Sequence, residues 1–198
     1  MKTIIISGPT GSGKTTLSKQ ILNKTNNGII LNTDMYYKTG IISKILSKLI
    51  NGYFDRKISF NYQLIKKDII YILKNCKSNH TYKYDFKNKT IKKSLIKKNR
   101  VDYLIIEGIF SKELLGVIKK YSFFLIEIKL KKELCMYRVI NRDVNERGKS
   151  EKIAKQDFLK SWDLYYIRNK KRCSIHDVNE LPFTEKNDLS FLLKKLSI

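Results

Sequence analysis

Residues 8–15 read GPTGSGKT, which has the G-x-x-x-x-G-K-[ST] spacing of a phosphate-binding loop. The glycines of this motif let the backbone curl, so that successive N–H groups face a phosphate at the start of a helix. Lys14 adds a positive charge toward the β- and γ-phosphates, and the hydroxyl of Thr15 is a ligand for Mg²⁺. The loop therefore predicts binding of ATP or GTP together with Mg²⁺. The residues expected to contact the nucleotide are Gly8, Thr10, Gly11, Ser12, Gly13, Lys14, Thr15 and Thr16.

The segments on either side of the loop supply the context that the motif requires. Residues 3–7 form a short β-branched run that predicts a buried strand, and residues 16–24 predict a helix. The alternative is a glycine-rich turn that matches the pattern by chance. The flanking strand and helix both argue against that alternative.

Acidic residues follow two further predicted strands. Residues 28–31 predict a buried strand that Asp34 follows, and residues 101–106 predict another that ends at Glu107. Ligands of an open parallel sheet bind at the carboxyl ends of its strands, so both carboxylates are expected beside the loop. Asp34 suits a base that deprotonates an acceptor hydroxyl, although a turn or N-cap aspartate is an equally good interpretation of its position. Glu107 is expected near Mg²⁺.

A cluster of arginines marks a candidate lid segment at about residues 142–150. Arg138 and Arg142 lie four residues apart on one face of a predicted helix, and Arg147 and Lys149 flank Gly148, where the chain can open. Guanidinium groups bind phosphate oxygens through paired hydrogen bonds. We expect a lid that closes over the transferring phosphate, and the alternative is a solvated helix end with local ion pairs.

The remaining pattern predicts one α/β domain over residues 1–198, with a parallel sheet flanked by helices as in P-loop NTPases. Alternating aromatic residues at 81–86 predict a strand that turns and returns at 91–96, which makes an inserted hairpin at about residues 80–97. Its aromatic face, Tyr82, Tyr84 and Phe86, is typical of a hairpin core. Helices are predicted at residues 41–50, 62–74, 131–143, 150–170 and 189–196, with strands at 123–128 and after residue 173.

The composition indicates an ordinary globular chain with an unusual charge. Hydrophobic residues make up 42% of the 198 residues, whereas 41 basic and 18 acidic residues give a net charge of +23. Such a charge can indicate a nucleic-acid partner, but lysines occur in every segment among many Ile and Asn residues, as an A/T-biased coding sequence also produces. Nucleic acid is therefore the less favoured partner.

The cysteines and apolar runs indicate the compartment. The three cysteines, Cys76, Cys135 and Cys173, lack metal or disulfide spacing, so we expect buried thiols and a cytoplasmic protein. No apolar run approaches the length of a membrane span, so no membrane partner is expected.

In these features the sequence resembles the uridine kinase family, in the phosphoribulokinase-like branch of P-loop kinases. The likeness runs from the loop to about residue 169 and rests on five segments that occur in that family's order. They are the loop with Lys14 and Thr15, Asp34-Met35-Tyr36-Tyr37, Tyr84-Asp85-Phe86, Glu107-Gly108-Ile109, and the lid segment from Arg142 to Lys149.

On the acceptor side, the resemblance implies a role for each matching position. Asp34 would be the base for a ribose 5′-hydroxyl, with Tyr37 beside it. Asp55 would hold the ribose hydroxyls, and Tyr84 and Phe86 would contact the pyrimidine.

On the donor side, the resemblance implies that Arg142 and Arg147 grip phosphates and that Glu107 lies near the metal. It also implies a homo-oligomer.

The sequence departs from the family pattern at four positions. Lys89 stands where the family has a histidine that reads the base edge, and Lys149 replaces the second lid arginine. An arginine expected one turn before Arg142 is either Val139 or, with a one-residue slip, Arg138. A glutamine expected in the following helix aligns with Asp157. The phosphate-handling half matches better than the part that would recognise the base.

We therefore predict a kinase that transfers the γ-phosphoryl group of ATP or GTP to the 5′-hydroxyl of uridine or cytidine, as in pyrimidine salvage. Two alternatives stay open. One is a kinase of the same family that acts on another small-molecule alcohol, and the other is a degenerate P-loop module that binds RNA or another polyanion.

Overall fold

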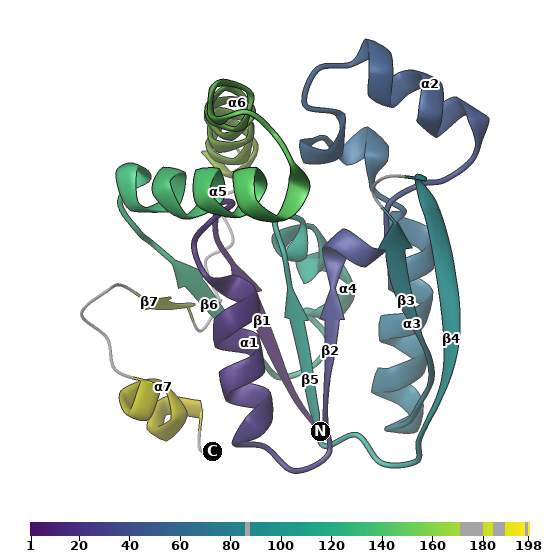
Figure 1. The fold of residues 1–198 in the computed structure, drawn as a ribbon. Coiled ribbons are helices and arrows are strands. Elements are labelled where there is room, and N and C mark those ends of the chain that lie inside the picture. Colours follow the sequence, from purple (N-terminus) through teal and green to yellow (C-terminus); the bar gives the residue numbers. More distant parts are fainter. Residues whose placement is uncertain (86–87, 171–179, 184–188, 197) are drawn as a thin grey trace.

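The computed structural model describes residues 1–85, 88–170, 180–183, 189–196 and 198. Its centre is a five-stranded sheet whose described strands all pair in parallel, which confirms the predicted fold class (Figure 1). The strand order is β2-β5-β1-β6-β7, so the phosphate-binding loop leaves the middle strand. The strands are β1 (Lys2–Ser7), β2 (Gly28–Asn32), β5 (Tyr103–Glu107), β6 (Phe123–Ile128) and β7 (Glu180–Phe183).

Helices cover both faces of the sheet because alternate side chains of a buried strand point to opposite faces. On β1, Ile4 and Ile6 pack with α1 and α7, whereas Ile5 belongs to the core cluster that contains α3 and α4. All three isoleucines are fully buried. The covering helices are α1 (Lys14–Asn23), α3 (Tyr62–Asn75), α4 (Leu115–Ile118) with the 3₁₀ turn η4 (Ser111–Leu114), and α7 (Leu189–Leu196).

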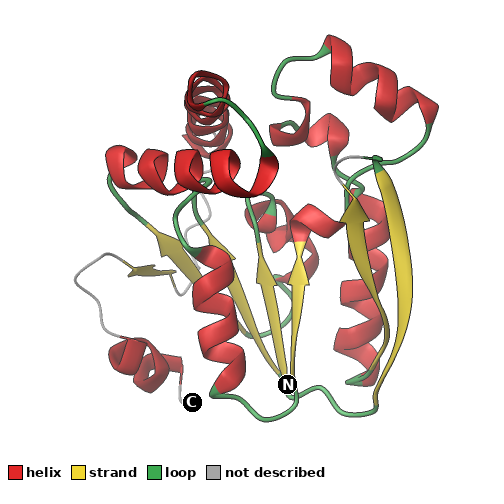
Figure 2. Ribbon diagram, viewed as in Figure 1, coloured by secondary structure: helices red, strands yellow, loops and turns green. Residues whose placement is uncertain are grey.

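The hairpin expected at about residues 80–97 consists of the antiparallel strands β3 (Ser78–Asp85) and β4 (Thr90–Lys98). It forms a two-stranded sheet of its own and does not join the parallel sheet (Figure 2). Tyr82 and Tyr84 of β3 pack against the same core cluster as α3. Phe86 lies outside the described residues.

Three helices stand above the carboxyl ends of the strands (Figure 1). α5 (Lys132–Arg147) crosses this edge and continues into α6 (Glu151–Lys170), while α2 (Ile41–Leu49) projects on the other side. The apolar side chains of α2 are largely exposed because the helix projects away from the sheet. Short 3₁₀ turns complete this edge: η1 (Thr33–Met35), η2 (Tyr53–Asp55) and η3 (Lys57–Ser59).

The structure corrects one expectation about the cysteines. Cys76 is exposed, because it caps the end of α3 at the surface in a left-handed conformation with φ 50°. Cys135 is buried, as expected, and Cys173 lies outside the described residues. Within the described ranges, no helix combines the length and the apolar character that crossing a bilayer requires.

Phe110 is a fully buried ring that connects the core to the upper helices. It stacks on Phe60 with 4.7 Å between ring centroids, and the guanidinium carbon of Arg168 in α6 lies 4.7 Å from its centroid. We expect Phe110→Ala to lower the free energy of unfolding by about 3–5 kcal/mol, because it removes both contacts and leaves a cavity. Denaturant titration measures this loss. Tyr137→Ala, at a position 65% exposed, is the control, and an equal loss in both variants would contradict the prediction.

Candidate active site

The phosphate-binding loop joins the end of β1 to the start of α1. Gly11 and Gly13 have φ values of 77° and 88°, which glycine adopts without strain. Gly11 also has no room for a side chain, since an added Cβ would lie 2.4 Å from the carbonyl oxygen of Cys135 in α5. Lys14 is buried, and its Nζ donates to the carbonyl of Pro9 at 2.8 Å. The loop is therefore shaped for backbone contact with a phosphate, and α5 packs directly against it.

A hydroxyl and a carboxylate lie together where Mg²⁺ is expected. Thr15 Oγ1 donates to Glu107 Oε1 at 3.0 Å, and the strand register places Glu107 beside Ile6 of β1 and Asn32 of β2. Asp34 is close enough to influence the pKa of Glu107, and its Oδ1 is buried with no hydrogen-bond partner among the described residues. Mg²⁺ binds through few protein oxygens and takes its remaining ligands from water and phosphates. Thr15 and Glu107 therefore fit this ion.

Burial raises the pKa of Glu107 to about 7, and the nearby negative charge of Asp34 adds to the rise. Protonated Glu107 therefore stabilises the metal-free protein at low pH, and this contribution is lost as the pH rises through about 7. We expect Glu107→Gln to be more stable than the wild type by on the order of 3 kcal/mol at pH 8, but by under about 1 kcal/mol at pH 5.

Denaturant titration at the two pH values, with EDTA present, measures the difference. Glu133→Gln, at an exposed position in the first turn of α5, is the control. The same stability gain of Glu107→Gln at both pH values would contradict the prediction.

Asp34 lies in η1, directly after β2, and faces the same edge of the sheet as the loop. The N-cap of η1 is Asn32, whose side chain accepts from the Asp34 backbone N–H at 2.7 Å, so the Asp34 carboxylate is not the cap. Burial raises the pKa of Asp34 and lowers that of Lys14, and each charge opposes the shift of the other. The glycine at position 108, directly after β5, lets η1 pack closely against it, because a Cβ at Gly108 would lie 1.8 Å from Thr33 Oγ1.

The largest cavity that we describe, the main cavity, has a volume of about 930 Å³. It lies between the loop, η1, η2 and the helices α5 and α6, and its size suits a small-molecule ligand. It brings together seven of the residues predicted to bind the nucleotide or the acceptor or to act in catalysis: Thr10, Asp34, Tyr37, Asp55, Arg142, Arg147 and Lys149. Phe54 and Ile109 contribute apolar surface to its wall.

Asp55 in η2 is fixed by residues of α6 that the sequence analysis missed. Ser161 Oγ donates to Asp55 Oδ1 at 2.7 Å, and Arg168 donates to the carbonyls of Asp55 and Ile109, both at 2.7 Å. Burial raises the pKa of Asp55, and the hydrogen bond from Ser161 opposes that rise. Ser161 and Arg168 are seven residues apart and so lie on the same face of the predicted helix. That spacing was the only feature of the sequence that linked the two residues.

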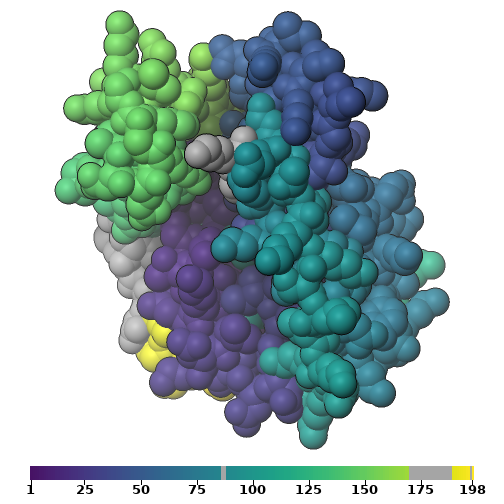
Figure 3. All heavy atoms as spheres, turned by 45° about the vertical axis from the view of Figure 1, so that its right-hand side comes forward, coloured from purple at the N-terminus to yellow at the C-terminus, as the bar shows by residue number. Residues whose placement is uncertain are grey.

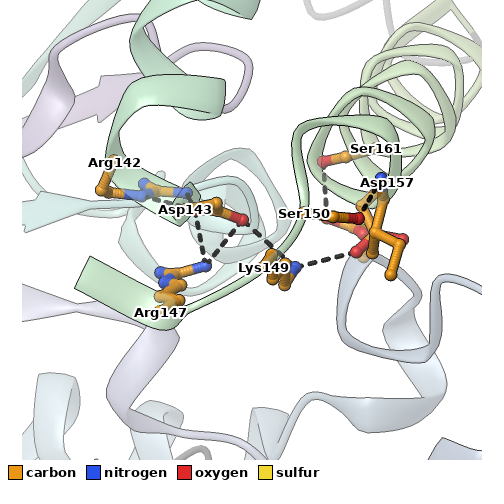
Figure 4. A network of polar contacts seen from close by, with 9 residues as sticks. Arg142, Asp143, Arg147, Lys149, Ser150, Asp157 and Ser161 are labelled. Atoms are coloured by element: carbon orange, nitrogen blue, oxygen red, sulfur yellow. Dashed lines mark hydrogen bonds and ion pairs between the residues drawn. The ribbon is translucent and has the colours of Figure 1, made fainter. Parts of the chain in front are cut away.

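The lid residues are joined in an ion-pair network around Asp143 (Figure 4). The Asp143 side chain is 3% exposed, and Arg142 donates to its Oδ1 through Nε at 2.9 Å and Nη2 at 2.8 Å. Arg147 Nη1 lies 3.3 Å from the same oxygen. Lys149 Nζ bridges Asp143 Oδ2 at 3.1 Å and Asp157 Oδ2 at 2.8 Å. Burial favours the neutral form of Asp143, but the ion pairs outweigh it and lower the pKa.

The helix expected at residues 131–143 continues to Arg147 and ends at Gly148, which has φ 65°. Arg142 and Arg147 therefore lie on the last turns of α5, and not on an open loop. The local ion pairs of the alternative interpretation are present. Asp143, at the centre of these ion pairs, is nevertheless buried, and Arg142 and Arg147 both line the main cavity.

Two residues expected to contact the acceptor base lie outside the main cavity. Tyr84 is 3% exposed and packs edge-on against Tyr37, with 5.3 Å between the ring centroids, so it lies behind the cavity wall. Lys89 Nζ donates to Ser47 Oγ at 2.5 Å. Ser47 lines a second cavity of about 480 Å³, which adjoins the main one.

Arg138 and Thr16 also lie away from the main cavity. Arg138 is near the phosphate-binding loop, since its Nη1 is 3.8 Å from the position that a Cβ on Gly13 would take. Arg138 therefore lies beside Gly13 of the phosphate-binding loop. Thr16 is exposed on the first turn of α1.

Known proteins resemble this chain in sequence over most of its length. The model of the Phosphoribulokinase / Uridine kinase family matches residues 3–171. A uridine kinase of Ureaplasma parvum is 32% identical over 151 residues, which cover 74% of this chain and 71% of that protein. A uridine kinase of Staphylococcus aureus is 31% identical over 147 residues, covering 73% and 70%.

Solved structures share the fold at lower identity. The D-glycerate 3-kinase of Cryptococcus neoformans has a TM-score of 0.63 at 12% identity, covering 92% of this chain and 85% of that one. A protein of Bacillus stearothermophilus described as a possible uridine kinase has a TM-score of 0.54 at 16% identity, covering 87% and 86%. With the phosphate-binding loop on a parallel sheet and a family match over residues 3–171, this chain belongs to the phosphoribulokinase/uridine kinase family and is an ATP-dependent phosphotransferase.

Proposed function

We propose that this kinase transfers the γ-phosphoryl group of ATP or GTP to the 5′-hydroxyl of uridine or cytidine, a reaction of pyrimidine salvage. The observation that carries the proposal is the main cavity itself. It contains Asp34 and Asp55, and Asp34 is near enough to Lys14 of the phosphate-binding loop for their charges to interact. The curated relatives named uridine kinase suggest the acceptor.

In the proposed reaction, the acceptor oxygen attacks the γ-phosphorus while the bond from that phosphorus to the bridging oxygen of the β-phosphate breaks. The hydroxyl proton passes to Asp34, which burial makes a stronger base than an exposed aspartate. The Tyr37 hydroxyl hydrogen-bonds to Asp34 and orients it. The loop N–H groups and Lys14 stabilise the negative charge on the phosphates.

Two further groups serve the donor. Thr15 and Glu107 would hold Mg²⁺, which supplies positive charge to the phosphate oxygens. Arg142 and Arg147 line the main cavity, and their guanidinium groups would exchange Asp143 for phosphate oxygens when the nucleotide binds.

On the acceptor side, we assign the ribose hydroxyls to Asp55, whose carboxylate Ser161 orients. Phe54 and Tyr37 provide the aromatic wall for the pyrimidine, and Tyr84 supports that wall from behind. Lys89 would meet the substrate only if the base extends into the second cavity.

The main rival is transfer to another small-molecule alcohol, which the lysine at position 89 favours. The polyanion-binding alternative predicts lysines gathered on one face. Exposed lysines instead occur on helices that cover both faces of the sheet, such as Lys19 of α1 and Lys67 and Lys74 of α3. This distribution supports the kinase proposal.

A panel of acceptors tests the proposed function. The purified protein is incubated with ATP and Mg²⁺, and consumption of ATP is measured with uridine, cytidine, the purine nucleosides and D-glycerate, with EDTA as the control. We expect turnover with one or both pyrimidine nucleosides. Phosphorylation of another alcohol alone would favour the rival. If no acceptor is phosphorylated and the protein binds RNA in a salt-sensitive manner, the polyanion module is favoured.

A further inference from the structure

Asp68 is a buried carboxylate on α3 that lies outside the main cavity. Its side chain is 8% exposed, and both of its oxygens have a partner. The Tyr36 hydroxyl donates to Oδ2 at 3.0 Å, and His80 Nε2 lies 3.1 Å from Oδ1. A buried carboxylate is costly to retain unless hydrogen bonds or an opposite charge compensate its lost hydration. Asp68 therefore depends on Tyr36 and His80, and the proposed reaction does not use it.

Three separate elements meet at this carboxylate. Asp68 lies on α3, Tyr36 directly follows η1, and His80 lies on β3 of the hairpin. In the space-filling view, the teal surface of the hairpin lies beside the blue surface of α3 (Figure 3). The Tyr82 ring packs edge-on against both aromatic partners, with 5.2 Å to the Tyr36 centroid and 5.1 Å to that of His80. Asp68 thus joins the hairpin and α3 to the segment that follows η1.

Tyr36 is held by α3 at two points. Its backbone carbonyl accepts from the N–H of Asn61, the N-cap of α3, at 2.7 Å. Its hydroxyl reaches Asp68, which lies about two turns further along the same face of the helix. Burial raises the pKa of Tyr36, and the negative charge of Asp68 adds to the rise, so the hydroxyl stays protonated and remains a donor. α3 therefore fixes both the backbone and the ring of Tyr36.

The position of Tyr36 affects two residues of the main cavity. Asp34 precedes it by two residues and Tyr37 follows it directly, and both line the cavity. Tyr37 in turn hydrogen-bonds to Asp34. A shift of Tyr36 would therefore move the carboxylate proposed as the base, and a misplacement of about 1 Å can lower a rate by about 10²-fold.

We propose that Asp68 is a positioning residue for the phosphoryl transfer: it holds Tyr36 so that the Asp34 carboxylate stays within reach of the acceptor hydroxyl. His80 orients Asp68 for this contact. The inference rests on the proposed function, in which Asp34 is the base, and it gives that base a support that lies outside the cavity. The competing interpretation is that the three side chains only fasten the hairpin to α3.

The first experiment compares Tyr36→Phe with the wild type on the accepted nucleoside. We expect kcat to fall about tenfold while the KM for ATP stays nearly constant, because only the geometry at Asp34 changes. The Tm should also fall, since one oxygen of the buried Asp68 loses its donor. The matched control is Tyr71→Phe on the same helix, whose hydroxyl accepts from Asn79 of β3 at 2.7 Å. This control should change kcat by less than about twofold.

The double variant Tyr36→Phe/Asp68→Leu separates positioning from stability. It removes both polar partners, and leucine has the branched shape of aspartate, so no buried carboxylate is left without its donor. We expect the Tm to return close to the wild-type value while kcat stays as low as in Tyr36→Phe. Recovery of kcat together with the Tm would show that the network serves only packing and would overturn the inference. An unchanged kcat of Tyr36→Phe would overturn it as well.

A second comparison tests whether the network acts through Asp34. In the Asp34→Asn background no base remains to be positioned, so adding Tyr36→Phe should lower kcat by less than about twofold. The same loss in both backgrounds would overturn the inference while the proposed function stands.

The wild type distinguishes failure of the inference from failure of the proposed function. If it phosphorylates no pyrimidine nucleoside, the proposed function fails, and the same variants are compared on the alcohol that is accepted. A kcat that stays low when the Tm recovers then supports the inference, and parallel changes of kcat and Tm overturn it. A protein that phosphorylates no alcohol overturns both.

Discussion

Asp34→Asn is expected to lower kcat by about 10²- to 10⁴-fold, because the amide cannot take the proton of the acceptor hydroxyl. Asparagine keeps the size of the side chain, so the packing of η1 against Gly108 should survive. Burial raises the pKa of Asp34, and the amide of the variant carries no charge at this buried position; the folded state should therefore be at least as stable as the wild type at neutral pH. The KM for ATP should change little, since Asp34 acts on the acceptor.

Steady-state kinetics with the accepted nucleoside and a thermal melt measure these effects. Asp102→Asn is the control, because Asp102 is an acidic residue at the opposite, amino end of β5. Near-normal turnover of Asp34→Asn would remove Asp34 from the role of base. The cavity would then need another proton acceptor, and the mechanism proposed above would be wrong.

Lys14→Ala is expected to lower kcat/KM by about 10³-fold, since it removes the fixed positive charge from the centre of the phosphate-binding loop. Lys14 is buried, and burial lowers its pKa, which shows that its charge is held at a cost to folding. The folded protein should therefore tolerate the change, although the hydrogen bond to the Pro9 carbonyl is lost. The variant separates a catalytic role of the charge from a structural one.

Kinetics and a thermal melt again provide the measurement, with Lys19→Ala on the exposed side of α1 as the matched control. A Lys14→Ala protein that keeps its fold and retains activity within tenfold of the wild type would contradict the donor site. Loss of activity together with loss of the melting transition would show instead that Lys14 serves the fold.

Short-range patterns in the sequence predicted the framework of this protein. The β-branched runs predicted buried strands because such residues favour extended backbone, and Ile4, Ile5 and Ile6 do fill both faces of the sheet. The loop spacing, with Asp34 and Glu107 each placed after a strand, predicted which side chains share one edge. That prediction needed no distances, since parallel strands gather their carboxyl ends together.

Other features were outside the reach of local patterns. The alternation of residues 81–86 predicted a hairpin core that contains Tyr84, whereas the resemblance implied a contact of Tyr84 with the base. The structure buries Tyr84 against Tyr37, behind the cavity wall. The apolar stripe of Ile41–Leu49 predicts a helix equally well whether its face is buried or, as here, exposed. In both cases the elements packed nearby decide the environment, and periodicity does not specify them.

The sequence by itself determined the loop, the strand that carries it, and the order of the acidic residues, because these depend on chain neighbours and on the geometry common to parallel sheets. Only the tertiary structure decided that Ser161 orients Asp55 across 106 residues of chain, and that Lys149 links the buried Asp143 to Asp157, which lines both cavities. Such contacts arise where separate helices meet, and their partners are fixed by packing distances that no spacing along the chain encodes.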